Sequence, residues 1–388
     1  MKTRELFLKD PLDWRIANDG VSSNNTGDLD TLRYELETFV CDGEYANGLV
    51  QILQGFLDNL GKEQRAAWIS GFYGSGKSHL AKVLRYLWSD FVFPGGDAAR
   101  HMTELPQEVR DLLTELSTRG KQSGGLHSAG GTLKSGNDSV RLRVLGIILE
   151  SVGLPPRYSE ARLILDLRDE GTLEPIRTAI ETAGKNPADE IRRLYTSKTF
   201  QNAYLSAHSH LGDVHNVGEA LRAQYGPKVD EISIDDMLEM ARRALGKDGE
   251  LPCTLVVLDE VQQFIGTDPA IAHDVQEVVE ALAKQMDGRV LVVGTGQSAL
   301  TDTPALQRLM GRFTTKVHLK DNDVEKVVRT VVLQKKEQAK GAIGTLVGKH
   351  EGEITRQLKT TRLATRAEDD DAYVPDFPLL PVRQWVLS

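Results

Sequence analysis

The sequence predicts an α/β fold of the P-loop NTPase type, with a parallel sheet, a helical insertion and a partial helical lid. Three observations carry this prediction. Residues 71–78, Gly-Phe-Tyr-Gly-Ser-Gly-Lys-Ser, match the phosphate-binding pattern G-x-x-x-x-G-K-[ST]. The apolar run at 66–70 is typical of a buried parallel strand, and apolar residues recur at helical spacing after the loop. The apolar runs at 254–260 and 289–297 predict two further strands of the same sheet.

The chemistry of the 71–78 loop explains its residue types. Gly71, Gly74 and Gly76 allow positive φ angles and a close approach of the backbone to phosphate oxygens. The loop N–H groups then point at the β-phosphate, at the positive end of the following helix. Lys77 can bridge the β- and γ-phosphates, and the Ser78 hydroxyl can bind Mg²⁺. The residues expected to contact ATP are Gly71, Phe72, Tyr73, Gly74, Ser75, Gly76, Lys77, Ser78 and His79.

The composition places the chain among globular proteins without a membrane span. With 388 residues it can hold about two or three domains. The formal net charge of −9 argues against a domain that coats nucleic acid through bulk electrostatics, although a local basic patch stays open. Cys41 and Cys253 lie far apart, so neither a disulfide framework nor a zinc site is expected. With no signal-peptide core or long apolar run, we expect a cytoplasmic location.

Residues 1–65 form an N-terminal helical lead-in, with a loop at 18–28 and helices at 31–39 and 49–60. Such a segment can pack beside the nucleotide base or can only support the edge of the sheet, and the sequence leaves both alternatives open. A polar helix at 104–116 follows the P-loop unit. The glycine-rich stretch at 119–137 is interpreted as loops around a strand at 126–133, because its spacing fits no phosphate-binding pattern.

Residues from about 140 to 246 are predicted to be a helical insertion. The expected helices include a long polar one at 187–210 and one that begins with a capping box at Ser233. His208, His210 and His215 lie close together in this segment. No Cys or carboxylate lies beside them at ligand spacing, which favours solvated or structural histidines over a metal site.

The second chemical centre is the run at 254–260, Thr-Leu-Val-Val-Leu-Asp-Glu. It predicts a central strand with Asp259 at its carboxyl end, which is where ligands bind in open α/β sheets. We expect Asp259 and Ser78 to share a Mg²⁺ ion, with Glu260 as the base that activates water for attack on the γ-phosphate. An acid at the end of a strand is a weak signal alone, and the P-loop strengthens it.

Three more polar residues are candidates for catalysis. Thr295 or Gln297 lies at the tip of the strand predicted at 289–297, level with the P-loop, where a polar group can orient the attacking water. Arg312 precedes a predicted strand at 315–319. It is the preferred candidate, ahead of Arg308, for an arginine finger that reaches the phosphate of a neighbouring subunit. An ordinary surface ion pair is the alternative for Arg312.

The predicted ATPase core spans 66–320, and 321–388 would form a helical lid and an extended tail. The pattern at 323–340 predicts a helix, 341–352 is rich in turn residues, and 356–371 is highly charged. The proline-containing end from Val374 is expected to be extended and to lead into a longer protein.

Three stretches resemble a known family: 68–79, 258–263 and the opening Arg4-Glu5-Leu6-Phe7, with a weaker likeness at 377–383. They are similar to the P-loop ATPases of bacterial BREX phage-defence systems, the BrxC and PglY family, from which Tyr73 is a conservative departure. The likeness runs along the whole chain, though its specific parts are short. It implies an N-terminal portion of a longer protein with an AAA+-like, additional-strand sheet similar to origin-recognition ATPases. It also implies ATP and Mg²⁺ as cofactors, homo-oligomers, and other BREX proteins as partners on DNA.

The leading expectation is an ATP-hydrolysing switch or motor. Its alternative is an ATP-dependent assembly scaffold with little turnover. A small-molecule kinase is a third alternative, which the adjacent Asp259-Glu260 pair and the long insertion disfavour. GTP is disfavoured because the chain has no [NT]-K-x-D motif.

Overall fold

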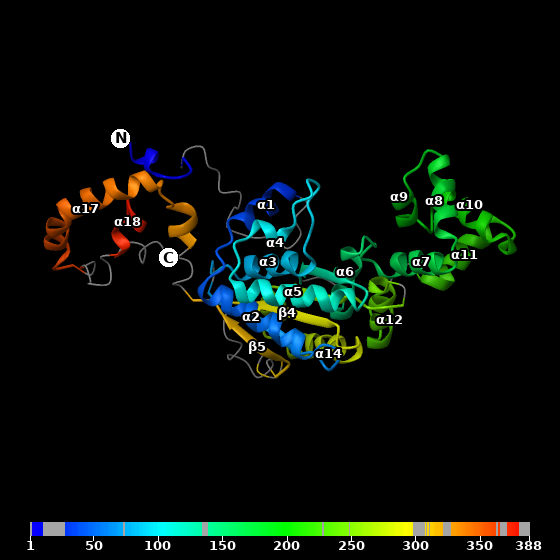
Figure 1. Ribbon diagram of the computed structural model, residues 1–388. Coiled ribbons are helices and arrows are strands. Elements are labelled where there is room, and N and C mark those ends of the chain that lie inside the picture. Colours follow the sequence, from blue (N-terminus) through cyan, green and yellow to red (C-terminus); the bar gives the residue numbers. More distant parts are fainter. Residues whose placement is uncertain are drawn as a thin grey trace.

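The computed structural model, shown in Figure 1, contains a sheet of five strands. The strands all run parallel, in the order β2-β3-β4-β1-β5. The predicted α/β class and parallel sheet are confirmed, and the sheet is compatible with a P-loop NTPase-like fold. The strands are β1 (Ala66–Ser70), β2 (Leu126–Thr132), β3 (Cys253–Asp259), β4 (Val290–Gly296) and β5 (Phe313–His318). The structure describes residues 2–10, 28–72, 74–133, 139–226, 229–247, 249–297, 307, 309, 311–320, 327–361, 364 and 371–379.

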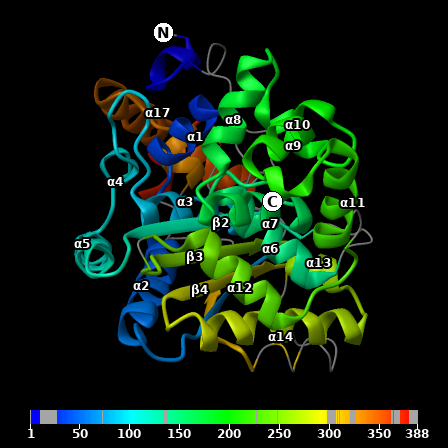
Figure 2. The ribbon, with the colours of Figure 1, turned by 90° about the vertical axis from the view of Figure 1, so that its right-hand side faces the viewer.

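Alternating side chains give the sheet two buried faces. In β3, Leu255 and Val257 belong to one hydrophobic cluster, while Val256 and Leu258 belong to the other. Every residue of β3 and of β4 is buried, as expected for central strands covered on both sides. Figure 2 shows α12 (Ile234–Leu245) and α14 (Pro269–Gln285) on one side of the strands and α2 (Gly43–Asp58) and α5 (Gln107–Lys121) on the other. The fold is therefore a three-layer α/β/α arrangement, with the carboxyl ends of all five strands at one edge.

The first helical layer comes from the N-terminal part of the chain. α1 and α2 correspond to the predicted helices at 31–39 and 49–60, but both end two residues earlier than expected, and α1 begins two and α2 six residues earlier. α3 follows the P-loop as predicted, and Leu80, Val83, Leu84 and Leu87 are all buried. The elements are η1 (Thr3–Leu6), α1 (Leu29–Glu37), α2 (Gly43–Asp58), α3 (Lys77–Ser89), α4 (Ala99–Met102) and α5 (Gln107–Lys121).

In the described part of residues 140–246 the regular elements are all helices, and their hydrophobic core is continuous with one face of the sheet. The predicted long helix at 187–210 is wrong. The chain breaks after Arg192 because the Ser197 hydroxyl caps a new helix by accepting a hydrogen bond of 2.9 Å from the Phe200 N–H. The capping box at Ser233 is confirmed. The elements are α6 (Val140–Ser151), α7 (Tyr158–Asp169), α8 (Leu173–Thr182), α9 (Pro187–Arg192), α10 (Lys198–Ala207), η2 (Ser209–Leu211), α11 (Val214–Tyr225) and α12 (Ile234–Leu245).

The C-terminal part differs most from expectation. The predicted helix at 323–340 is interrupted, because a π-helical turn ends at Val332 and a new helix begins at Glu337; residues 321–326 lie outside the described part. The turn-rich segment 341–352 is instead the middle of that helix. Glycine lowers helix stability by about 1 kcal/mol per residue. Ala339, Ile343 and Val347 nevertheless share one apolar face that packs against Leu6.

The predicted extended end is wrong for residues 374–376, which lie in a short helix whose Tyr373 and Asp376 are buried, while residues 380–388 lie outside the described part. The first residues join the same cluster: Phe7 forms an antiparallel bridge with Lys335, and the Lys336 N–H donates a hydrogen bond of 3.0 Å to the Leu6 carbonyl. Among the described helices, none combines the length and apolar character needed to cross a membrane. The remaining elements are α13 (Val261–Ile265), α14 (Pro269–Gln285), η3 (Val328–Val332), α17 (Glu337–Leu358) and α18 (Tyr373–Asp376).

Candidate functional site

The P-loop connects β1 to α3, and its three described glycines are required for different reasons. A Cβ at Gly71 would collide with the Ser75 hydroxyl and lie 3.1 Å from the Leu319 carbonyl oxygen. Gly74 has open space around it but a φ of +83°. Gly76 combines a φ of +77° with a Cβ position 2.6 Å from the Tyr45 hydroxyl. These positions favour glycine because of backbone conformation, space, or both.

Ser78 and Asp259 meet at the carboxyl edge of the sheet. The Ser78 hydroxyl donates a hydrogen bond of 3.1 Å to Asp259 Oδ1, although the two residues are 181 positions apart. Asp259 ends β3 and is only 3% exposed. The two residues expected to share a metal ion are therefore in contact.

Thr295 completes a network around the same carboxylate. Its hydroxyl donates to Asp259 Oδ1, and it accepts a hydrogen bond of 3.0 Å from the Glu260 N–H. The Glu260 N–H also lies 3.1 Å from Asp259 Oδ1. This contact depends on the strand order, because β4 lies between β1 and β3 and so brings its tip beside Asp259.

Glu260 has a strained backbone, with a φ of +57° at a residue that has a Cβ. Two acceptors hold its N–H, and it begins the short helix α13. Strain of this kind costs on the order of 1–3 kcal/mol and is found mainly at functional sites, where the surrounding structure enforces it. This backbone conformation sets the direction in which the chain continues at Glu260, between the end of β3 and the start of α13.

Lys77 lies at the first position of α3, and its Nζ donates a hydrogen bond of 2.6 Å to the Phe72 carbonyl. Burial lowers the pKa of Lys77, and the negative charge of Asp259 opposes that shift. The ammonium group is thus held at the loop by an uncharged carbonyl, and a phosphate anion can replace that partner.

The donor set at this edge fits a magnesium-bound triphosphate. A hydroxyl and a carboxylate are the hard oxygen ligands that Mg²⁺ uses in proteins, and it takes few of them because phosphate and water supply the rest. The loop also presents backbone at the start of a thirteen-residue helix. Ser78 and Asp259 would hold the ion, which would neutralise phosphate charge. Among the described residues, no group of three or more His, Cys, Asp or Glu side chains could hold a metal.

The other expected loop residues lie in different surroundings. Ser75 is fully buried and, among the described side chains, its hydroxyl has no hydrogen-bond partner. The His79 ring stacks on Phe39 with 5.6 Å between ring centroids, and burial lowers its pKa. Phe72 is 37% exposed, and Tyr73 lies outside the described residues.

Gln297 is set apart from Thr295. It is exposed, and its N–H donates a hydrogen bond of 2.9 Å to Gln262 Oε1. Of the two candidates left open at the end of this strand, only Thr295 contacts Asp259 in the described structure.

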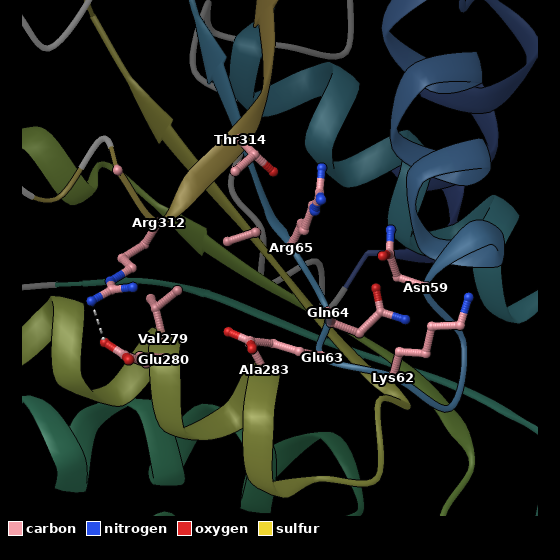
Figure 3. Close-up of a pocket in the computed structure, with 12 residues that line it drawn as sticks. Asn59, Lys62, Glu63, Gln64, Arg65, Val279, Glu280, Ala283, Arg312 and Thr314 are labelled. Carbon is pink, nitrogen blue, oxygen red and sulfur yellow. Dashed lines mark ion pairs between the residues drawn. The ribbon is translucent and has the colours of Figure 1, made fainter.

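Arg312 lies at the opposite edge of the sheet, just before β5, and Arg308 is outside the described residues. The Arg312 guanidinium forms an ion pair of 3.0 Å with Glu280 of α14, and its side chain is 41% exposed. Figure 3 shows this pair on the wall of a cavity of about 490 Å³, which Lys62 and Arg65 also line. Arg312 is therefore remote from the P-loop of its own chain.

Sequence reasoning did not single out Tyr45, which contacts the P-loop, or Gln262, which contacts Gln297 just after β4. The Tyr45 hydroxyl donates a hydrogen bond of 2.8 Å to the Ser75 carbonyl. The Gln262 side chain accepts from the Gln297 N–H, after the strand that carries Thr295. Neither contact leaves a local pattern, because each joins segments that are distant in sequence. No protein-family model matches the chain.

Proposed function

We propose that this chain is a Mg²⁺-dependent ATPase module. The observation that carries the proposal is the contact of 3.1 Å between the hydroxyl that follows the P-loop lysine and the carboxylate that ends β3. A P-loop alone supports phosphate binding, whereas this pairing supports a metal-bound triphosphate held between two strands.

The roles follow from the contacts. Lys77 neutralises the β- and γ-phosphates, and Ser78 and Asp259 hold Mg²⁺. Glu260 is the base for the attacking water, and its strained backbone, held by two hydrogen bonds, supports a fixed position for it. Thr295 orients Asp259 and the Glu260 peptide. The product of the reaction is ADP with inorganic phosphate.

We assign the module to the AAA+-like, additional-strand class. The position of β4 between β1 and β3, and the polar Thr295 at its tip, support that assignment. We assign Arg312 the role of an arginine finger that acts on the phosphate bound to a neighbouring subunit of a homo-oligomer. Its side chain is partly exposed and remote from the P-loop of its own chain.

The resemblance to the BREX ATPases supports a biological role for the module. It would act in the cytoplasm as a nucleotide-driven switch or motor that organises other BREX proteins on DNA. A scaffold that binds ATP with little turnover is the second candidate, because every contact described above serves binding as well as hydrolysis.

Single-turnover measurements with labelled ATP, with and without DNA, test the proposal. Release of phosphate in step with ADP supports the ATPase, while tight binding without release supports the scaffold. Transfer of the label to an acceptor molecule would indicate a kinase. Size measurement with a non-hydrolysable ATP analogue tests the oligomer in the same preparation.

A further inference from the structure

The segment that precedes the sheet lies directly behind the P-loop. Phe39, which stacks on His79, also meets the Tyr45 ring edge-on, with 5.8 Å between centroids. One turn further along α3, the Lys82 ammonium forms an ion pair of 2.5 Å with Glu35, and both side chains are almost fully buried. Residues 35–45 thus contact the loop and two successive turns of the helix that follows it.

Tyr45 makes the contact nearest to the phosphate-binding backbone. The tyrosine is 6% exposed, and its hydrogen bond to the Ser75 carbonyl is buried. The next carbonyl, that of Gly76, accepts a hydrogen bond of 2.8 Å from the Leu80 N–H and so begins the α3 ladder. The Tyr45 side chain therefore holds the peptide that joins Ser75 to Gly76, and the helix holds the next peptide, which joins Gly76 to Lys77.

We propose that Tyr45 is a positioning residue for nucleotide binding, which rests on the ATP site proposed above. A trans peptide is planar, so its C=O and N–H groups point in opposite directions. Because the tyrosine hydroxyl holds the Ser75 C=O, the Gly76 N–H points to the other side, into the phosphate loop. Tyr45 thereby fixes a donor for the β-phosphate without touching the nucleotide.

The position of the hydroxyl is itself rigid. α2 packs so closely on β5 that a Cβ at Gly48, one turn after Tyr45, would lie 2.6 Å from a Val317 methyl carbon. Glu44 forms an ion pair of 2.5 Å with Lys320, just beyond β5. The helix that carries Tyr45 is therefore fixed to the same sheet that carries the loop, and the hydroxyl cannot follow the loop if the loop moves.

The test compares Tyr45→Phe with Tyr86→Phe in the 388-residue chain. Tyr86 lies in the second half of α3, where its ring meets Phe91, so the control makes the same chemical change at a second buried tyrosine, away from the P-loop. The measurements are Kd for MgADP and for MgATP, together with KM and kcat for ATP hydrolysis.

We expect Tyr45→Phe to raise both Kd values and KM about tenfold, which is about 1.4 kcal/mol. The two nucleotides should be affected alike, because both carry the β-phosphate. The value of kcat should stay within about twofold, because the loop holds that phosphate equally in the ground state and the transition state. The control should leave KM within about twofold of the wild type.

Two results would overturn the inference. An unchanged Kd and KM would show that the hydroxyl does not orient the loop. A fall in kcat at constant KM would show a smaller folded fraction instead of a positioning effect. Absence of nucleotide binding by the wild type is a separate outcome, and it would overturn the proposed ATP site together with this inference.

Hydrogen exchange provides a second measurement that does not depend on turnover. With MgADP bound, amides in the 71–78 segment should exchange faster in Tyr45→Phe than in the wild type. The amides of α5 should be unaffected. Equal protection of the loop in both proteins would contradict the assignment.

Discussion

The Ser78 hydroxyl lies 3.1 Å from the Asp259 carboxylate, and this contact joins the end of the P-loop to the end of β3. β1, which leads into the P-loop, and β3, which ends at Asp259, are not neighbours, because β4 separates them. The pairing therefore depends on the whole central sheet.

Removing the Lys77 ammonium should abolish nucleotide binding. In Lys77→Ala the β- and γ-phosphates lose their closest cation, so we expect Kd for MgATP to rise at least 100-fold, which is about 2.7 kcal/mol. Lys62→Ala, an exposed lysine at the opposite edge of the sheet, is the matched control and should bind as the wild type does. Calorimetric titration measures both, and retained binding in Lys77→Ala would exclude the P-loop as the site.

Glu260→Gln should separate binding from turnover. The amide keeps the size and the backbone contacts of Glu260 but cannot accept a proton from water. A general base contributes typically 10²–10⁴-fold, so kcat should fall by about that factor while Kd for MgATP stays within about threefold. Rapid-quench measurement of phosphate release checks this. Hydrolysis at the wild-type rate would remove Glu260 from its proposed role.

Thr295→Val should lower turnover more than Thr295→Ser. Valine keeps the shape but removes the hydroxyl that donates to Asp259 and accepts from the Glu260 N–H. Loss of a buried hydrogen-bonding group costs about 1–3 kcal/mol, so kcat/KM should fall roughly 5- to 150-fold. Serine restores the hydroxyl and should recover most of that loss. Thr314→Val, an exposed threonine on β5, is the control. Equal kinetics for Thr295→Val and Thr295→Ser would show that the hydroxyl is not used.

Arg312 can be tested against its ion-pair partner. If Arg312 acts on the phosphate of a neighbouring subunit, Arg312→Ala should lower kcat of the oligomer by about 10³-fold or more. Glu280→Ala removes the same ion pair but leaves the guanidinium in place, and should change kcat little. A partly exposed ion pair contributes at most about 1 kcal/mol to stability, so both variants should remain folded. Equal kinetic effects of the two substitutions would assign Arg312 to the surface ion pair alone.

Because of His127, the free energy of unfolding should decrease in mild acid. Burial lowers the pKa of this histidine on β2 from 6.5 to about 4, and the charges of Lys247 and Arg85 add to the shift. Between pH 6.5 and pH 4 the unfolded chain therefore binds a proton that the folded chain does not, so stability decreases as the pH falls through that window. His127→Gln lacks this titration and retains an amide to replace the hydrogen bond of 2.8 Å with Ser151. Urea unfolding at pH 7.5 and pH 5 should show a larger loss for the wild type than for the variant, and equal losses would contradict the assignment.

Local patterns in the sequence were sufficient for the strands and for the P-loop. Residues 66–69 are apolar because β1 is buried on both faces, and the glycine spacing reflects backbone conformations that other residues adopt at a cost. Asp259 could be located in the same way, since it ends a continuous apolar run. These features are readable because their causes lie within a few residues of one another.

The same reasoning failed where a distant partner decides the conformation. Gly341 and its neighbours have turn propensity, yet they lie in α17 because Leu6, from the other end of the chain, covers the apolar face of that helix. The error at 187–210 has a local cause instead: the expected helix ends at Arg192, and the Ser197 hydroxyl begins a new one by accepting a hydrogen bond from the Phe200 N–H.

The sequence by itself determined which residues carry charge, hydroxyl groups and backbone freedom at the loop and at the end of β3. Only the tertiary structure decided that Thr295, and not Gln297, touches Asp259, and that Tyr45 supports the loop from behind. The physical reason is range: periodicity and turn chemistry act over a few residues, whereas these contacts depend on strand order and on how closely α2 packs against the sheet.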